Sequence, residues 1–143
     1  MYGSLSAIRA EFSEPFLTCT AAPCTQPTIV VPAGNRLPGV PSYTAYLETK
    51  YRLHDTDIAL EMRAQSSLPV DDRGTDAGPD YALFNLALAR TFLVGPAKFR
   101  AFLRIDNLLN ARYIGSVIVN EANGRFFEPA PGRSWLLGLD ARL

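Results

Sequence analysis

The chain has 143 residues, of which 48% are apolar and 20% are charged, and its 14 basic residues balance 14 acidic ones. A chain of this length normally forms one domain with a core of its own. Because the formal net charge is zero, nothing in the composition points to nucleic acid as a partner. The composition does not separate a soluble protein from a membrane β-barrel, whose walls alternate apolar and polar residues.

The first part of the chain is expected to hold one weak strand followed by a long loop. Residues 2–12 alternate poorly, because Leu5 and Ile8 fall on opposite faces of an extended chain. The uncharged stretch 15–35 contains several prolines and threonines, so we expect a loop there and not a transmembrane helix. Residues 1–12 lack a basic region, an apolar region and a cleavage site in succession, and therefore no signal peptide is expected.

Both cysteines, Cys19 and Cys24, lie within this expected loop. A pair this close, with no other Cys or His nearby, is a poor metal site, but it can close a small disulfide loop. Free thiols are the alternative, and the sequence leaves both open. A disulfide would indicate an oxidising compartment outside the cytoplasm.

From residue 42 onward, apolar and polar residues alternate in several segments. The regular segments are 42–53, 57–65, 98–106 and 134–143. A further segment, 81–92, is interrupted by Leu83 and Arg90. Such alternation is what a sheet with one apolar and one wet face requires. Together with 2–12, the pattern predicts about six strands and no helix.

The two faces of the expected sheet differ in chemistry. The apolar face includes Leu47, Leu60, Leu103 and Leu137. The opposite face carries charges of both signs, at Glu48, Lys50, Arg52, Glu61, Arg63, Arg100, Arg104, Asp106, Asp140 and Arg142. A wet barrel lumen and the solvated side of a soluble sheet would both accept such a face. The apolar side chains separate the two hypotheses, since they face a closed core in a soluble domain and face outward in a membrane wall.

The expected connections alternate in length. Short turns at 54–56 and 93–97 contrast with long loops at 13–41, 66–80 and 107–133. This asymmetry is typical of outer-membrane barrels, which have short periplasmic turns and long extracellular loops. The expected strand lengths are also close to the roughly 9–11 residues that cross a bilayer at a tilt. We therefore predict an all-β fold, an antiparallel up-and-down meander that forms a fragment of a transmembrane β-barrel.

The polar loops offer no set of residues for catalysis or metal binding. The segment DDRGTDAGPD contains Asp71, Asp72, Asp76 and Asp80, but its spacing does not match a calcium-binding EF-hand loop. His54 lies in a short turn beside Asp55 and is expected to be an ordinary surface residue. No nucleophile–base pair and no phosphate-binding glycine loop can be assembled. The sequence predicts no enzyme activity, no metal and no cofactor.

Three segments together resemble a known family. They are PAGNRLPGVPSYTAYLETKYRL, FRAFLRIDNLLNARYIGSV and NEANGRFFEPAPGRSWLLGLDARL, and they resemble the C-terminal barrel strands of TonB-dependent outer-membrane receptors. In that family the penultimate strand ends in D-N-L-x-x-x-x-Y, here Asp106, Asn107 and Leu108 with Tyr113. The resemblance covers almost the whole chain and keeps the order of its parts.

This resemblance implies an energised transporter of the bacterial outer membrane. Such receptors have a barrel of about 22 strands filled by an N-terminal plug domain, and they import ferric siderophores, cobalamin and similar complexes with force delivered by TonB. Residues 1–143 show nothing like a plug, so we expect the C-terminal part of such a barrel. The implied partners are outer-membrane lipid, the rest of the barrel with its plug, TonB through the missing N-terminal part, and a ferric chelate. The alternatives are a fragment of a passive porin-like or adhesin barrel and a soluble all-β binding domain.

Within this hypothesis several residues acquire expected roles. Tyr43 and Trp135 are expected at the membrane interface, where amphipathic rings prefer the headgroup level. The last loop contains possible ligand contacts that could instead pack the loop against its neighbours: Arg125, Phe126, Phe127, Glu128 and Arg133. The chain ends on Leu143, where the family usually has an aromatic residue that helps the assembly machinery, so this signal is expected to be weaker.

Overall fold

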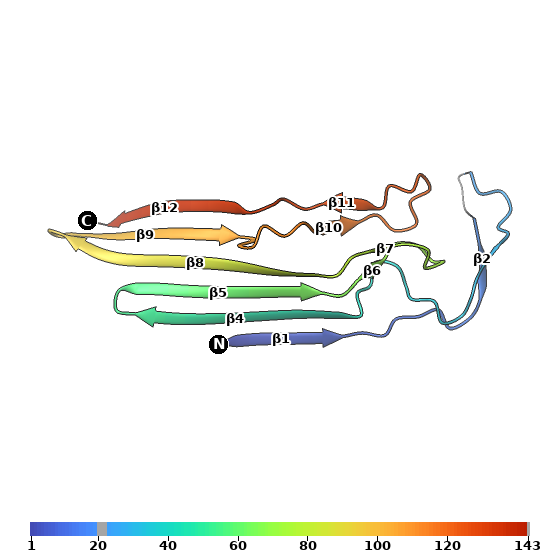
Figure 1. Ribbon diagram of the computed structural model, residues 1–143, viewed down its shortest axis with the longest axis horizontal. Coiled ribbons are helices and arrows are strands. Elements are labelled where there is room, and N and C mark those ends of the chain that lie inside the picture. The colour runs from blue at the N-terminus through green and yellow to red at the C-terminus, as the bar shows by residue number, and fades with distance from the viewer. Residues whose placement is uncertain (20–22, 143) are drawn as a thin grey trace.

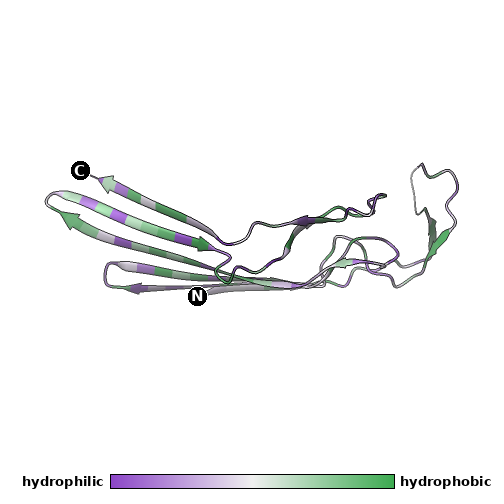
Figure 2. Ribbon diagram, turned by 45° about the horizontal axis from the view of Figure 1, so that its top comes forward, coloured by the Kyte–Doolittle hydropathy of each residue, from purple (hydrophilic) through white to green (hydrophobic). Residues whose placement is uncertain are grey.

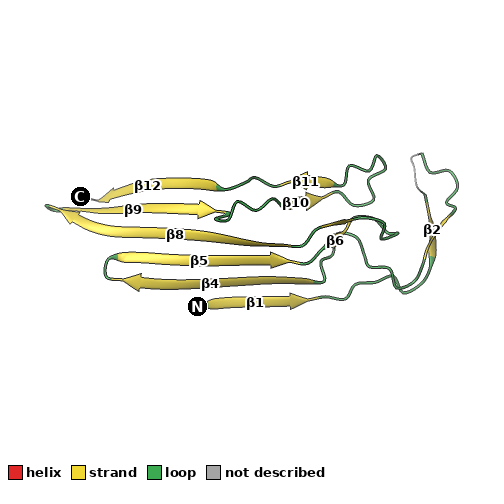
Figure 3. Ribbon diagram, viewed as in Figure 1, coloured by secondary structure: helices red, strands yellow, loops and turns green. Residues whose placement is uncertain are grey.

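The computed structural model describes residues 1–19 and 23–142. It shows one large sheet whose strands lie side by side, with loops extending beyond one end (Figure 1). Figure 3 shows that the described residues form strands and loops throughout. No helix in this part of the chain is long and apolar enough to span a membrane.

The large sheet contains six strands in the order β1-β4-β5-β8-β9-β12. Their bounds are Tyr2–Ala7, Tyr43–Leu53, Thr56–Gln65, Tyr81–Val94, Ala97–Asp106 and Ser134–Arg142. Every neighbouring pair is antiparallel, so the sheet is an up-and-down meander. This confirms the predicted fold, and the sheet is open, with β1 and β12 at its edges.

Strand β1 is shorter than the sequence predicted. It ends at Ala7 and not at residue 12, because the following residues pair with a distant part of the first long loop. The N–H of Phe12 donates to the carbonyl of Asn35 at 2.9 Å, and the N–H of Leu37 donates to the carbonyl of Ala10 at 2.9 Å. This competing pairing draws the chain out of the large sheet.

Each long loop contains a short two-stranded ribbon that the sequence did not predict. The ribbons pair β2 (Phe16–Thr18) with β3 (Ile29–Val31), β6 (Leu68–Pro69) with β7 (Ala77–Gly78), and β10 (Ile114–Val117) with β11 (Phe127–Pro129). Strands of two to four residues are too short to show a period in the sequence. They extend the wall beyond the large sheet at its loop end (Figure 1).

The two ends of the sheet differ as predicted. At one end, two-residue turns at 54–55 and 95–96 connect β4 to β5 and β8 to β9. The first turn has His54 at φ 54°, and the second has Gly95 at φ 58°. These left-handed residues reverse the chain tightly, which a glycine does without steric cost. At the other end lie the three long loops (Figure 1), and we call the two ends the turn end and the loop end.

The apolar face of the sheet is not covered by a protein core. Leu60 and Leu137 are 44% and 77% exposed, and Leu47 and Leu103 are partly exposed. Between the described elements, extensive contacts occur only where strands pair within a sheet. Hydrophobic and hydrophilic residues alternate along the strands of the sheet (Figure 2). A soluble monomer rarely leaves so large an apolar surface uncovered, so the finding disfavours a soluble all-β domain.

Candidate functional site

The polar face of the sheet is organised around an ion pair between β5 and β9. Arg104 donates to both carboxylate oxygens of Glu61 at 3.3 and 3.2 Å. Its Nε also donates to Asp106 at 2.9 Å. A two-pronged arginine–carboxylate contact fixes geometry as well as charge, so Glu61 and Arg104 are held in one arrangement across the intervening strand β8.

Asn85 on β8 lies between these groups and connects them to the last long loop. Its Nδ2 donates to Glu61 at 3.2 Å, and its Oδ1 accepts the backbone N–H of Asn107 at 2.9 Å. Asn85 and Asn107 are only 8% and 4% exposed. In the described residues no buried side-chain nitrogen or oxygen lacks a hydrogen-bond partner.

The D-N-L motif forms the base of the last long loop. Asn107 has φ 52°, and its side chain donates to the carbonyl of Ala111 at 2.8 Å and accepts the N–H of Ala111 at 2.9 Å. Asparagine tolerates this left-handed conformation and bonds to nearby backbone better than most residues do. The ring of Tyr113 then packs against Tyr81 at a centroid distance of 4.9 Å. The motif therefore has a structural role in starting the loop.

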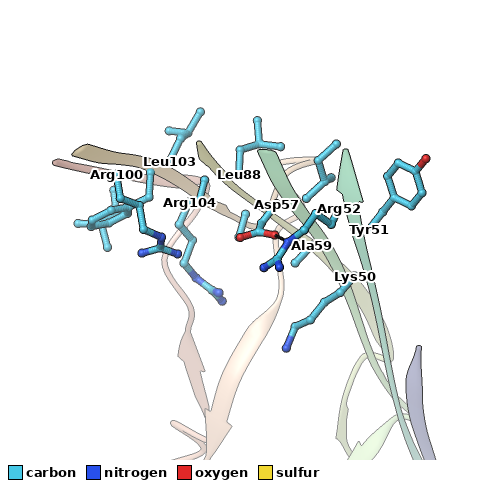
Figure 4. Close-up of a pocket in the computed structure, with 14 residues that line it drawn as sticks. Lys50, Tyr51, Arg52, Asp57, Ala59, Leu88, Arg100, Leu103 and Arg104 are labelled. Carbon is cyan, nitrogen blue, oxygen red and sulfur yellow. Dashed lines mark hydrogen bonds and ion pairs between the residues drawn. The ribbon is translucent and has the colours of Figure 1, made fainter. Parts of the chain in front are cut away.

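Toward the turn end, the polar face is hollowed. A depression of about 630 Å³ is lined by residues that include Lys50, Arg52, Asp57, Arg100 and Arg104. In Figure 4 the basic side chains extend to one side of the strands, whereas Leu88, Leu103 and Tyr51 extend to the other. The basic side chains have acidic partners, since Arg52 pairs with Asp57 and Arg100 lies 3.8 Å from Asp140. The predicted face of mixed charge is thus present, and it is concave.

A second hollow lies at the loop end, between the sheet and the β10–β11 ribbon. It measures about 430 Å³, and its polar lining comes from Arg63, Tyr81, Tyr113, Ser116 and Glu128. The Arg63 guanidinium lies 5.7 Å from the ring centroid of Tyr46, and its distance of 4.0 Å from Glu61 is long for an ion pair. We call this the mouth hollow. It combines a weakly paired cation with tyrosine rings.

The structure brings four of the five predicted ligand contacts together. Glu128 lines the mouth hollow and accepts a hydrogen bond from the Ser116 hydroxyl. Phe126 and Phe127 are adjacent, with ring centroids 6.2 Å apart, and Arg125 precedes them in the loop. All four lie on or next to β11.

The fifth predicted contact, Arg133, lies apart at the base of the loop. Its guanidinium is 5.7 Å from the ring centroid of Trp135, and its backbone N–H donates to Asn110 at 3.0 Å. The hydrogen bond to Asn110 holds the end of the loop to its beginning.

Glu121 was not singled out by sequence reasoning, although it organises the tip of the last loop. Its carboxylate accepts the N–H of Asn123 at 2.7 Å and that of Arg125 at 3.1 Å. The hydrogen bond from the Arg125 N–H, supported by those from Asn123, lowers the pKa of Glu121 below its ordinary value. A polar residue two to four positions before an Asn-Gly pair is the local signal that could have indicated this turn.

Contacts between the three long loops also could not be predicted from the sequence. The Asn35 side chain donates to the carbonyl of Asp72 at 2.9 Å. Asn120 accepts the Asp72 N–H at 3.0 Å and donates to its carboxylate at 3.0 Å. We call these three residues the loop latch, because one comes from each long loop.

The acidic segment 71–80 closes on itself. Asp71 is buried and accepts hydrogen bonds from the hydroxyl and the N–H of Thr75. Burial acts to raise the pKa of Asp71, but the Thr75 hydrogen bonds and the charge of Arg73 outweigh it and lower the pKa. Within residues 1–19 and 23–142, no three Asp, Glu, His or Cys side chains gather as a metal site.

The structure joins Cys19 and Cys24 in a disulfide, with their Cα atoms 5.8 Å apart. It closes the far end of the β2–β3 ribbon, beyond the pairing of Thr18 with Ile29. Residues 20–22 between the cysteines lie outside the described residues, as does Leu143.

Aromatic side chains mark both ends of the apolar face. At the loop end, Tyr43 is the first residue of β4 and Trp135 the second of β12, and they are 45% and 62% exposed. At the turn end, Tyr51 is exposed and Phe92 stacks on Phe99 at 5.6 Å between centroids. The apolar face is therefore bordered by aromatic side chains at the loop end and at the turn end.

Two solved structures share this architecture. One is the siderophore receptor PiuA from Acinetobacter baumannii, with a TM-score of 0.63 and 23% identity over 76% of this chain and 15% of that one. The other is the ferric citrate transporter FecA in its unliganded form, with a TM-score of 0.63 and 18% identity over 76% of this chain and 18% of that one. The chain has the fold of a segment of these receptors.

This likeness confirms at the level of the fold the resemblance inferred from the sequence. The chain spans less than a fifth of either receptor, and no family model matches it. The neighbours are a receptor and a transporter.

Proposed function

We propose that residues 1–143 form the C-terminal part of the barrel wall of a TonB-dependent receptor in the bacterial outer membrane. The receptor would take up a ferric siderophore or a similar metal chelate. The observation that carries the proposal is the uncovered apolar face bordered at both ends by aromatic side chains, in a sheet with the fold of such receptors. In this proposal the described residues serve as wall and loops and have no enzyme activity.

The dimensions of the apolar face suit a bilayer. Tyr43 and Tyr51 lie eight residues apart on β4, which corresponds to about 26 Å along the strand. A tilt of about 40° would reduce this to about 20 Å along the membrane normal, close to the apolar band of about 25 Å in such barrels. Leu47 and Leu60 lie at intermediate positions and would contact lipid tails.

The open edges of the sheet support a longer wall. In hydrocarbon each unpaired backbone group costs several kcal/mol, and β1 and β12 each have one free edge. We place further strands of the same receptor against both edges, and its plug against the concave polar face. Contact with TonB would then occur through the plug-bearing part and not through residues 1–143.

The mouth hollow supplies the chemistry for an anionic chelate. Arg63 offers a cation with a weak acidic partner, and Tyr81 and Tyr113 offer aromatic surface. Phe126 and Phe127 lie on the adjoining ribbon. A planar anionic ligand can pair with a guanidinium and stack on such rings. We therefore propose that the ligand contacts the wall here.

Uptake in living cells tests this function. In the bacterium that encodes the chain, deletion of its gene is expected to abolish accumulation of radioactive iron supplied as the matching chelate, and the intact gene to restore it. Removal of TonB should have the same effect as the deletion. Iron uptake that depends on the gene but persists without TonB would contradict the proposal and would indicate a passive barrel.

A further inference from the structure

A hydrogen-bond chain runs from the polar face of the wall into the base of the last long loop, and it is buried at Asn85 and Asn107. Its members are Arg104, Glu61, Asn85 and Asn107. We propose that Glu61 and Asn85 are positioning residues for loop 107–133, so that the charge arrangement on the polar face determines how firmly this loop is held. The inference rests on this geometry alone and does not require that a metal chelate is transported.

The Asn85 amide is oriented by its two hydrogen-bond partners. Its nitrogen donates to Glu61 at 3.2 Å, and its oxygen accepts the Asn107 N–H at 2.9 Å. The amide is 8% exposed, so water cannot readily replace either partner. If the carboxylate of Glu61 is lost, nothing else among these contacts keeps the Asn85 oxygen directed at Asn107. A buried N–H left without its acceptor costs about 1–3 kcal/mol.

The base of the loop depends on Asn107. Besides its own side-chain bonds to Ala111, the Asn107 carbonyl accepts the N–H of Asn110 at 2.8 Å. Asn110 in turn accepts the N–H of Arg133 at 3.0 Å. Both ends of the loop are therefore joined through the turn that Asn107 starts.

The base and the tip of the loop are held by different contacts. The tip is held by the loop latch, where Asn120 bonds to Asp72. The latch shares no residue with the chain from Glu61 to Asn107. Loss of the Asn85 contacts should therefore loosen the base and leave the tip in place, whereas Asn120→Ala should do the opposite.

The test is hydrogen exchange of backbone amides in the full chain in detergent micelles, because exchange reports local opening. The amides to follow are those of Leu108, Ala111 and Arg133 at the base and Asp72 at the latch. Asn85→Asp keeps the acceptor for Asn107 but removes the donor to Glu61 and sets two carboxylates against each other. Because Glu61 repels the new carboxylate, we expect it to turn away from the Asn107 N–H, and exchange at the base should rise by about tenfold or more, the equivalent of one lost hydrogen bond. Exchange at Asp72 should not change.

A double variant that exchanges the two side chains should restore slow exchange at the base of the loop. In Glu61→Gln with Asn85→Asp, the amide and the carboxylate trade places, so a donor and an acceptor face each other again. Base exchange should return to within about threefold of the original rate. Glu61→Gln alone is the milder variant, and it should raise base exchange in a fully folded chain. Asp140→Asn, on the same face but outside the network, is the matched control and should have no effect.

Circular dichroism should show the same strand content for all these chains, so that exchange rates are compared between folded proteins. Base exchange that stays unchanged in both single variants would overturn the proposal. A double variant that exchanges as fast as Asn85→Asp would also overturn it, because the damage would then come from the changed residue itself and not from its pairing with Glu61.

Discussion

The ring of Phe102 on β9 occupies the space above Gly138 on β12, where any Cβ atom would collide with it. The two residues are direct partners in the pairing of these strands. Gly138 is therefore needed for close approach and not for an unusual backbone conformation. The Arg100 guanidinium also lies 5.9 Å from the centroid of the Phe102 ring. This aromatic cover stabilises the attachment of an edge strand on the polar face.

Replacing Gly138 should loosen β12. In Gly138→Val the new side chain forces Phe102 out of its position, and overpacking of this kind costs about 1–3 kcal/mol. The free energy of unfolding, measured by urea titration of the chain in detergent micelles, should fall by that amount. Gly3→Ala on the opposite edge strand is the matched control, because a Cβ there meets Leu47 at 3.4 Å, an ordinary contact. Equal stability of the two variants would contradict this role of Gly138.

Reduction of the disulfide should affect one ribbon and spare the sheet. A crosslink between Cys19 and Cys24 closes a small loop, and such a constraint contributes about 2 kcal/mol to local order. Exchange of the Thr28 amide, which donates to Thr18 at 3.2 Å, should accelerate in Cys19→Ser with Cys24→Ser. Amides in the centre of β8 should keep their rates. If the β8 amides accelerate as much as Thr28, the disulfide supports the whole fold and the prediction is wrong.

The turn at the tip of the last loop should open in acid. The N–H groups of Arg125 and Asn123 lower the pKa of Glu121 below the ordinary value of 4.5. A depressed pKa means that the contribution to stability is present above the ordinary value and is lost as pH falls through the folded pKa. NMR shifts of the Asn123 and Arg125 amides should therefore change with a midpoint below pH 4.5. Glu121→Gln should abolish this change, and a midpoint at or above the ordinary value would contradict the assignment.

Much of the sheet could be predicted because alternation is a local property. Strands β4, β5 and β9 have the predicted bounds to within one residue, since each has one apolar and one polar row. The structure explains the two residues that interrupt the alternation of β8. Leu83 lies on the polar face but is buried at the mouth hollow, and Arg90 lies on the apolar face near the turn end.

The loop end could not be predicted because its order comes from contacts between distant residues. The loop latch joins Asn35, Asp72 and Asn120, and no pattern in the sequence relates these positions. The same is true of Asn85, whose value depends on its reach to Asn107. The predicted ligand contacts around β11 are consecutive in the sequence, so they could be predicted as one group. Only the structure shows that Arg133 lies apart from them, beside Trp135.

Trp135 is the only tryptophan of the chain, and it can report whether the apolar face of this sheet lies against lipid. The measurement is its fluorescence in vesicles whose lipids carry bromine at known depths. We expect strong quenching by bromine near the headgroups and weaker quenching by bromine near the chain ends. A reporter moved to the middle of the face, Trp135→Phe with Leu103→Trp, should show the reverse order. If emission from both chains resists every brominated lipid and yields to a water-soluble quencher, the apolar face does not contact the membrane.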